Sequence, residues 1–341
     1  MGIRVPDRVP DRMPDLVLGL DGGNSKTDVV LADSTGRVLA RRRGPGTRSH
    51  VDGIATMVDG LAVLVDEVRA GAGIAPSQPV AVGAFYIANL DLPEAEREAQ
   101  QAIAARGLAS RVVVGNDTVA VLHAGAPDGW GVAVVSGAGI NAIGVDPAGT
   151  VARFLALGEA TGDWGGGWAV SVSGIGAAVR AGDGRGAATL LGDRLAKHFD
   201  RTSVEQVAID VADGTIRQHD VITAAPVVFR AAVDGDDVAA AIVHRLGDEV
   251  VEFVRAAVNR LGLNDIDVPV VLGGGTLQHG PTLLLDHITA QLAHQVPRAL
   301  PRVLDVPPVA GALLSALATA GAGHDVLARA RAALTARDAG T

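Results

Sequence analysis

One arrangement of short strands and turns occurs twice in this chain. Each copy has an apolar strand, a glycine loop, a second strand, a turn and a third strand. The first copy occupies residues 16–43 and contains the loop GGNSKT, and the second occupies residues 131–157 and contains SGAG. An apolar run that enters a glycine turn and leaves as another apolar run is typical of a β-hairpin. We interpret the repeat as a duplicated β-meander, which predicts two related domains facing each other.

The segments after each meander predict further strands and helices, so the expected class is α/β. In the first half we expect strands at 79–90 and 111–117, and helices at 53–71, 92–107 and 118–126. In the second half we expect one strand at 268–275 and helices at 165–181, 186–199, 236–262, 281–296 and 309–338.

The predicted domain boundaries follow from this pattern. Residues 1–15 repeat VPDR, and proline at every fourth position forbids a helix and weakens a strand, so we expect a disordered tail. The first domain is expected at 16–124 and the second at 125–322. A C-terminal helix at about 323–339 could pack on the first domain.

Composition excludes several classes of protein. The 341 residues include no cysteine, which rules out disulfides, thiolate zinc sites, iron–sulfur clusters and cysteine nucleophiles. The net charge of −9 disfavours nucleic acid as a partner. No apolar run is long enough to span a membrane, and the N-terminus has no apolar secretion signal. We therefore expect a cytoplasmic protein with no membrane partner.

The two hairpin loops are candidate phosphate-binding loops. The first contains Gly22, Gly23, Asn24, Ser25, Lys26 and Thr27, and the second contains Ser136, Gly137, Ala138 and Gly139. The first lacks the order of a Walker loop and is followed by strand rather than helix, unlike a dinucleotide fingerprint. Glycines let backbone N–H groups approach an anion closely, and Asp21 is placed to hold Mg²⁺ through water. The alternative is two structural turns that need glycine for positive φ.

A third glycine site follows the strand at 268–275. Gly273, Gly274, Gly275 and Thr276 end this strand and could open a helix. Small residues there would let a flat base or a ribose lie against the backbone. The alternative is a tight turn from strand to helix.

Six motifs in this order resemble the N-acetylglucosamine kinase branch of the BadF/BadG/BcrA ATPase family, within the actin-like superfamily. They are GLDGGNSKT, GNDT, SGAGIN, GDWGGG, VVLGGG and PVAGALL, spread over residues 16–322. The resemblance implies two ribonuclease-H-like domains with a cleft between them that binds ATP and Mg²⁺. It implies that the two hairpin loops hold phosphates, that residues 273–276 line the adenosine pocket, and that a sugar hydroxyl receives the γ-phosphate.

The same resemblance implies roles for several polar residues. Asp117 would be the catalytic base, and the sugar contacts would include Asn89, Asp91, Asn116, Asp117, Asn141 and Asp163. Asp117 and Asp163 each precede a predicted helix, so the alternative is that they are N-caps. One carboxylate within hydrogen-bonding reach is enough to help a hydroxyl attack a phosphoryl group.

Departures from the family pattern leave the acceptor sugar open. Leu157 stands at an expected Trp, and the TRSH segment at 47–50 replaces a segment that holds an Asn in relatives. We expect phosphorylation of an amino sugar, with N-acetylglucosamine at its 6-hydroxyl as the leading acceptor. Glucosamine or another hexose remains an alternative, as does a non-catalytic sugar sensor. A homodimer is a further expectation from the family.

Overall fold

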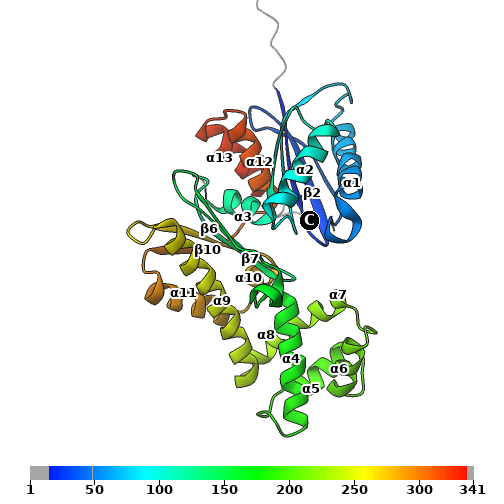
Figure 1. Cartoon of the computed structure of the whole chain (residues 1–341), viewed down its shortest axis with the longest axis vertical. Coiled ribbons are helices and arrows are strands. Elements are labelled where there is room, and N and C mark those ends of the chain that lie inside the picture. Colours follow the sequence, from blue (N-terminus) through cyan, green and yellow to red (C-terminus); the bar gives the residue numbers. More distant parts are fainter. Residues whose placement is uncertain (1–14, 48, 127, 336–341) are drawn as a thin grey trace, which may run out of the picture. The chain divides into compact units, whose positions relative to one another are not determined.

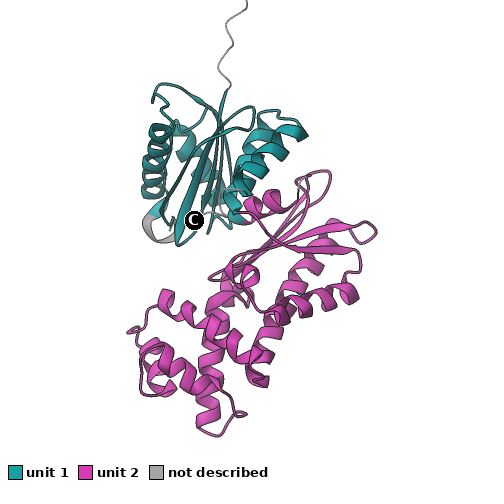
Figure 2. Cartoon of the chain, turned by 180° about the vertical axis from the view of Figure 1, so that it is seen from behind, with its two compact units in different colours: residues 1–117, 307–341 teal, residues 118–306 magenta. Residues whose placement is uncertain are grey.

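The computed structural model describes residues 15–47, 49–126 and 128–335. Residues 1–14 of the predicted disordered tail and the last residues of the predicted C-terminal helix lie outside these ranges. The chain divides into two compact units (Figure 2). Unit 1 contains residues 1–117 and 307–341, and unit 2 contains residues 118–306.

Unit 1 is built on a five-stranded mixed sheet in the order β3-β2-β1-β4-β5. Its strands are β1 (Leu16–Gly22), β2 (Lys26–Asp33), β3 (Val38–Pro45), β4 (Val80–Ile87) and β5 (Arg111–Asn116). The first three form the predicted antiparallel meander, whereas β4 and β5 run parallel to β1. Three parallel strands therefore end at one edge of this sheet.

Helices cover both faces of this sheet (Figure 1). They are α1 (Ser49–Gly71), α2 (Pro93–Ala105), α12 (Pro308–Thr319) and α13 (His324–Thr335). Side chains alternate along a strand, and Leu16, Leu18 and Leu20 of β1 join the core that also contains α1 and α2 residues. Gly19 points the other way, toward α12.

Unit 2 repeats the same sheet topology. Its strands are β6 (Gly131–Ser136), β7 (Ile140–Val145), β8 (Val151–Arg153), β9 (Val268–Gly273) and β10 (Ala299–Val303). Their order is β10-β9-β6-β7-β8, with an antiparallel meander followed by two strands parallel to β6. The predicted α/β class, with two mixed sheets flanked by helices, is confirmed.

Unit 2 differs from unit 1 mainly in a helical insertion between β8 and β9. This insertion holds α4 (Gly166–Gly182), α5 (Leu191–His198), α6 (Val204–Ala212), α7 (Gln218–Val221), α8 (Ala225–Val233) and α9 (Asp237–Leu261), together with the 3₁₀ turns η1 (Gly158–Thr161) and η2 (Ile222–Ala224). The remaining helices are α3 (Asp117–Gly125), which begins at the last residue of unit 1, α10 (Gly275–Gln278) and α11 (Thr282–Gln295).

The structure differs from the sequence-based assignment in three places. The sequence patterns did not predict α6 to α8 or strand β10; β10 is a short edge strand that contains a proline, which weakens the strand signal. The single helix expected at 309–338 is two helices, because the chain turns at Gly321 with φ of 87°. Helix α12 belongs to unit 1, whereas the sequence grouped it with the second domain.

Helix α12 lies close to β1 because Gly19 has no side chain. A Cβ atom built on Gly19 would lie 2.3 Å from the backbone nitrogen of Leu313 and 2.7 Å from its Cα. Backbone atoms of a buried helix cannot move aside as the end of a long side chain can. The close packing of α12 on β1 therefore requires glycine at this position.

We expect Gly19→Ala to lower the free energy of unfolding by about 1–3 kcal/mol, because the added methyl group overpacks the β1–α12 contact. Gly60→Ala is a matched control, since Gly60 lies on the exposed face of α1 with nothing within 4 Å of its built Cβ. That control should raise stability by about 0.5–1 kcal/mol through helix propensity. Urea denaturation followed by circular dichroism measures both changes, and equal effects of the two substitutions would contradict the packing argument.

Candidate active site

The first glycine loop joins β1 to β2 in a tight hairpin. The N–H of Gly23 donates to the carbonyl of Lys26 over 2.9 Å. Asn24, Ser25 and Lys26 are exposed at the tip, as a phosphate-binding loop requires. Thr27 differs from these three tip residues: it is fully buried, and its hydroxyl donates to the carbonyl of Pro45 over 2.7 Å. The Thr27 side chain therefore joins β2 to β3 and does not face the solvent.

Neighbouring segments fix the orientation of this hairpin. The N–H of Thr47 donates to the carbonyl of Gly23 over 2.9 Å, and the N–H of Ala88 donates to that of Gly22 over 2.8 Å. In a trans peptide the C=O and N–H point in opposite directions, so the N–H of Asn24 points away from Thr47. The Asn89 side chain, at a residue with φ of 65°, donates to the side chain of Asn24 over 2.7 Å. Asn89 thus braces the loop tip.

Polar residues follow three neighbouring strands at one edge of the unit 1 sheet. Gly22 of β1 is in register with Ile87 of β4, and Ile87 is in register with Asn116 of β5. Asp21 and Asp117 therefore lie about two strand spacings, or about 10 Å, apart. Ligands of α/β proteins bind at the carboxyl ends of parallel strands, which is where these residues gather.

The surroundings of Asp21 disfavour the ionised form of its carboxyl group. Burial, followed by the negative charges of Asp117 and Asp28, raises the pKa of Asp21 to about 8, while Lys26 opposes the shift. A divalent cation beside Asp21 would relieve this repulsion. Within the described ranges, no three His, Asp or Glu side chains gather closely enough to hold a metal ion. Mg²⁺ fits nevertheless, since it commonly uses one or two carboxylates, several waters and substrate phosphates.

A hydrogen-bond network fixes the backbone beside Asp117. The Asn116 side chain donates to Asp91 over 2.8 Å, and the Asn116 N–H donates to the Glu96 carboxylate over 3.1 Å. Asn116 is buried, whereas Asp91 and Asp117 are half-buried. Helix α3 begins at Asp117. The sequence patterns did not single out Glu96, because an acid in the first turn of α2 is already explained by the helix dipole.

The second glycine loop joins β6 to β7 and is oriented by α4. The N–H of Gly167 donates to the carbonyl of Gly137 over 2.8 Å, and the N–H of Trp168 donates to that of Ala138 over 3.0 Å. Both peptides are trans, so the N–H groups of Ala138 and Gly139 point away from α4. Two adjacent N–H groups pointing the same way are the donors that an anion needs.

The third glycine site lies beside the second loop. Gly274 has φ of 86°, and a Cβ there would lie 2.4 Å from the carbonyl oxygen of Ser136. The Thr276 hydroxyl donates to the Ser136 carbonyl over 2.6 Å and also bonds the Ser136 hydroxyl. Ser136 is fully buried. The side chains of Ser136 and Thr276 therefore tie β6 to α10, and the glycines allow the close approach.

The structure also describes the two predicted sugar contacts of unit 2. Asn141 is the second residue of β7, and its side chain accepts a bond from the N–H of Ala142 over 2.7 Å. Asp163 accepts a bond from the Thr161 hydroxyl and lies in the loop before α4. The N-cap of α4 is Gly165 rather than Asp163, so the alternative role of Asp163 as a cap is wrong.

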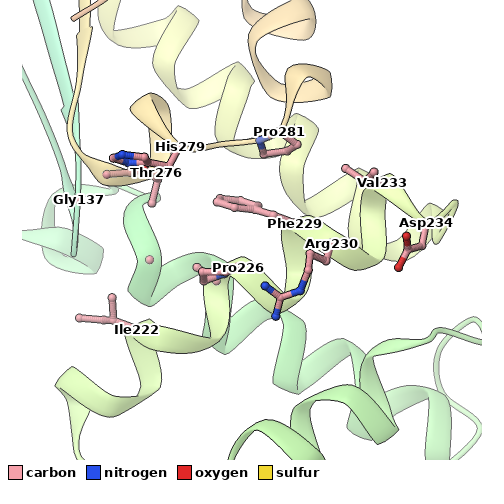
Figure 3. A pocket seen from close by; sticks show the side chains of 13 residues that line it. Gly137, Ile222, Pro226, Phe229, Arg230, Val233, Asp234, Thr276, His279 and Pro281 are labelled. Carbon is pink, nitrogen blue, oxygen red and sulfur yellow. Dashed lines mark hydrogen bonds between the residues drawn. The ribbon is translucent and has the colours of Figure 1, made fainter. Parts of the chain in front are cut away.

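Unit 2 contains a cavity of about 560 Å³ next to these two loops (Figure 3). Its lining includes Gly137, Gly275 and Thr276 from the predicted nucleotide site. The rest of the lining comes from the helical insertion and from the segment between α10 and α11: Gly167, Ile222, Ala225, Pro226, Phe229, Arg230, Val233, Asp234, His279 and Pro281. The α8 residues were not predicted, because an apolar helical stripe is equally typical of a buried core.

A family comparison decides the classification. The model of the BadF/BadG/BcrA/BcrD ATPase family matches residues 18–316. The chain belongs to this family. The resemblance that the motifs predicted is thereby confirmed.

Two curated relatives of the chain are named as sugar kinases. The chain is 25% identical over 266 residues to the N-acetylmuramic acid/N-acetylglucosamine kinase of Clostridium acetobutylicum, covering 77% of this chain and 86% of that one. It is 23% identical over 315 residues to the N-acetyl-D-glucosamine kinase of Dictyostelium discoideum, covering 89% and 98% of the two chains.

A solved structure supports the fold assignment. The chain superposes with a TM-score of 0.69 on a Chromobacterium violaceum protein that is provisionally named an N-acetylglucosamine kinase. The two are 21% identical, and the match covers 88% of this chain and 98% of that one.

None of the helices within residues 15–47, 49–126 and 128–335 is sufficiently long and apolar to cross a membrane.

We expect Gly166→Ala to weaken nucleotide binding by roughly tenfold, because it disturbs the loop at 137–139. Gly166 has φ of 74°, and its built Cβ would lie 2.4 Å from the carbonyl oxygen of Gly139. Gly176→Ala is the control within α4, because nothing lies within 4 Å of its built Cβ. Titration with a fluorescent ATP analogue, alongside thermal unfolding, measures both. Unchanged affinity in a folded Gly166→Ala variant would show that α4 does not set the loop.

Proposed function

We infer that the chain is an ATP-dependent sugar kinase. The observation that carries this inference is that each unit contains one feature that a kinase needs. Unit 1 gathers Asp21, Asn116 and Asp117 at the ends of parallel strands, and unit 2 has oriented loop N–H groups beside a large cavity. Kinases need a carboxylate near the acceptor hydroxyl and donors around the phosphates, and little other chemistry. Family membership and kinase relatives support the same conclusion.

The proposed acceptor is an amino sugar, with N-acetylglucosamine at its 6-hydroxyl as the first candidate. The names of two relatives at 25% and 23% identity support this choice. Glucosamine or another hexose derivative is the alternative. Proposed contacts are Asn89, Asp91, Asn116, Asp117, Asn141 and Asp163. Asn89 would act at most indirectly, because its amide already holds Asn24.

The nucleotide would occupy the cavity of unit 2. The apolar side chains of Ile222, Pro226 and Phe229 suit the faces of a purine, and Gly275 allows a ribose to approach the backbone. The N–H groups of Ala138 and Gly139 would donate to phosphate oxygens. In unit 1 the exposed tip at residues 24–26 supplies further donors, with Lys26 as the cation. Thr27 and Ser136 would contribute through the backbone, because their hydroxyls are buried.

Asp21 would hold Mg²⁺ through water, and the ion would supply positive charge that neutralises the phosphates. The acceptor hydroxyl attacks the γ-phosphorus, the bond between that phosphorus and the bridging oxygen breaks, and ADP leaves. Asp117 takes the hydroxyl proton as general base. Asn116, held by Asp91 and Glu96, fixes the backbone that carries Asp117.

A non-catalytic sugar sensor is the alternative function. A coupled assay of ADP release over amino sugars, N-acetylated sugars and plain hexoses separates the two. A kinase releases ADP and forms a sugar phosphate with at least one acceptor. A sensor binds a sugar, as calorimetry would show, without releasing ADP, and that result would refute the kinase assignment.

We expect Asp117→Asn to lower kcat by about 10²–10⁴-fold while ATP and sugar affinities change little, because the amide cannot accept the proton. Asp66→Asn, on the exposed face of α1, is the control and should keep full activity. Steady-state kinetics and binding titrations measure these effects. Unchanged kcat would remove Asp117 from the mechanism.

Lys26→Ala should weaken ATP binding roughly tenfold and leave sugar affinity nearly unchanged, because Lys26 is an exposed cation at the tip of the first loop. Lys197→Ala replaces the chain's other lysine, which is exposed on α5, and serves as the control. Calorimetry with ATP and with sugar measures the two affinities separately. An equal loss of both would indicate general damage to unit 1 rather than a phosphate contact.

A further inference from the structure

One face of α8 forms the wall of the unit 2 cavity that lies away from the glycine loops (Figure 3). This face carries Pro226, Phe229, Arg230, Val233 and, just after the helix, Asp234. The spacing of three and four residues places these side chains on one side of a helix. The same wall therefore carries apolar side chains together with one basic and one acidic residue.

The cavity has two ends with different chemistry. Gly137 and Thr276 lie at one end, where the second and third glycine loops meet, and Asp234 lies at the other (Figure 3). Arg230 lies between them on the α8 wall. In the proposed function the phosphates and ribose lie at the glycine end. A purine attached to that ribose would then direct the edge furthest from the sugar toward the Asp234 end of the cavity.

The Asp234 carboxylate is held in place at its end of the cavity. Arg194 of α5 donates to its Oδ2 atom, which leaves Oδ1 as a second acceptor. The side chain is 53% exposed, so it forms the rim of the cavity rather than part of the core. An ionised carboxylate only accepts hydrogen bonds. It therefore favours a ligand group that donates and repels a carbonyl oxygen.

Purines differ at the position that would meet this carboxylate. Adenine carries an amino group on C6, which donates, and an acceptor at N1. Guanine and hypoxanthine carry a carbonyl oxygen on C6 and a donor at N1, so the order of donor and acceptor is reversed. An acceptor at Asp234 matches the 6-amino group of adenine and opposes the carbonyl oxygen of the 6-oxo purines.

We propose that Asp234 selects the nucleotide by accepting a hydrogen bond from the 6-amino group of adenine. This proposal rests on the kinase function proposed above, because it needs the nucleotide in the unit 2 cavity. It assigns to α8 the discrimination between ATP and nucleotides that carry a 6-oxo purine.

The test compares ATP with inosine triphosphate, which differs at C6 and N1 but lacks the 2-amino group of guanine. Wild-type protein should prefer ATP by about tenfold or more in kcat/KM. Asp234→Asn should reduce that preference roughly tenfold, because the amide can turn its NH₂ toward a carbonyl oxygen. Asp234→Ser is a second variant, which should lose preference through weaker use of ATP. Asp237→Asn, an exposed acid on the next helix, is the control and should keep the wild-type ratio.

Each outcome is informative. A folded Asp234→Asn protein, verified by thermal unfolding, that keeps the wild-type ratio of ATP to inosine triphosphate would overturn the proposal. Equal use of both nucleotides by wild-type protein would overturn it as well. If wild-type protein releases no ADP with any of the sugars, the kinase function itself fails, and this result is distinct from a kinase whose selectivity ignores Asp234.

Discussion

The direction of a few peptide groups determines what this fold can bind. In both hairpin loops a neighbouring segment occupies the carbonyl oxygens: Thr47 bonds Gly23, and the first turn of α4 bonds Gly137 and Ala138. Because a trans peptide points its N–H opposite to its C=O, each bond also fixes the direction of an N–H donor. A loop that were free to rotate would have to order itself on binding an anion, and that entropy would reduce affinity. Glycines such as Gly166 and Gly274 are needed here mainly because a side chain would prevent the neighbouring backbone from packing so closely.

The second constraint is electrostatic. Parallel strands bring the carboxylates of Asp21 and Asp117 to one edge of the unit 1 sheet, and Asp28 lies nearby on the adjacent strand. Burial and like charge make the Asp21 anion unfavourable. Carboxylates placed this close together reduce the stability of the fold unless a cation offsets their charge. A cluster of this kind at the end of a strand is therefore typical of a functional site rather than a structural one.

Much of the architecture was predictable because the signals are local. The duplicated meander, the strand at 268–273 and the long helix α9 follow from apolar periodicity and glycine turns within short windows of sequence. The insertion helices α6 to α8 were not assigned from their sequence patterns. Glu96 was not connected with Asn116, because their hydrogen bond joins residues 20 positions apart. Helix α12 was grouped with the wrong neighbours for the same reason: its contact with Gly19 joins residues almost 300 positions apart.

The sequence by itself determined which residues stand at the ends of strands, because strand and turn propensities act over a few neighbouring residues. It thereby indicated the loops, the acids and the family. Only the tertiary structure decided where each side chain points. Thr27 and Ser136 belong to the predicted loops, yet their hydroxyls bond Pro45 and Thr276 in the interior. The wall of the cavity likewise depends on how α8 packs beside the glycine loops, and that packing is set by long-range burial rather than by any local pattern.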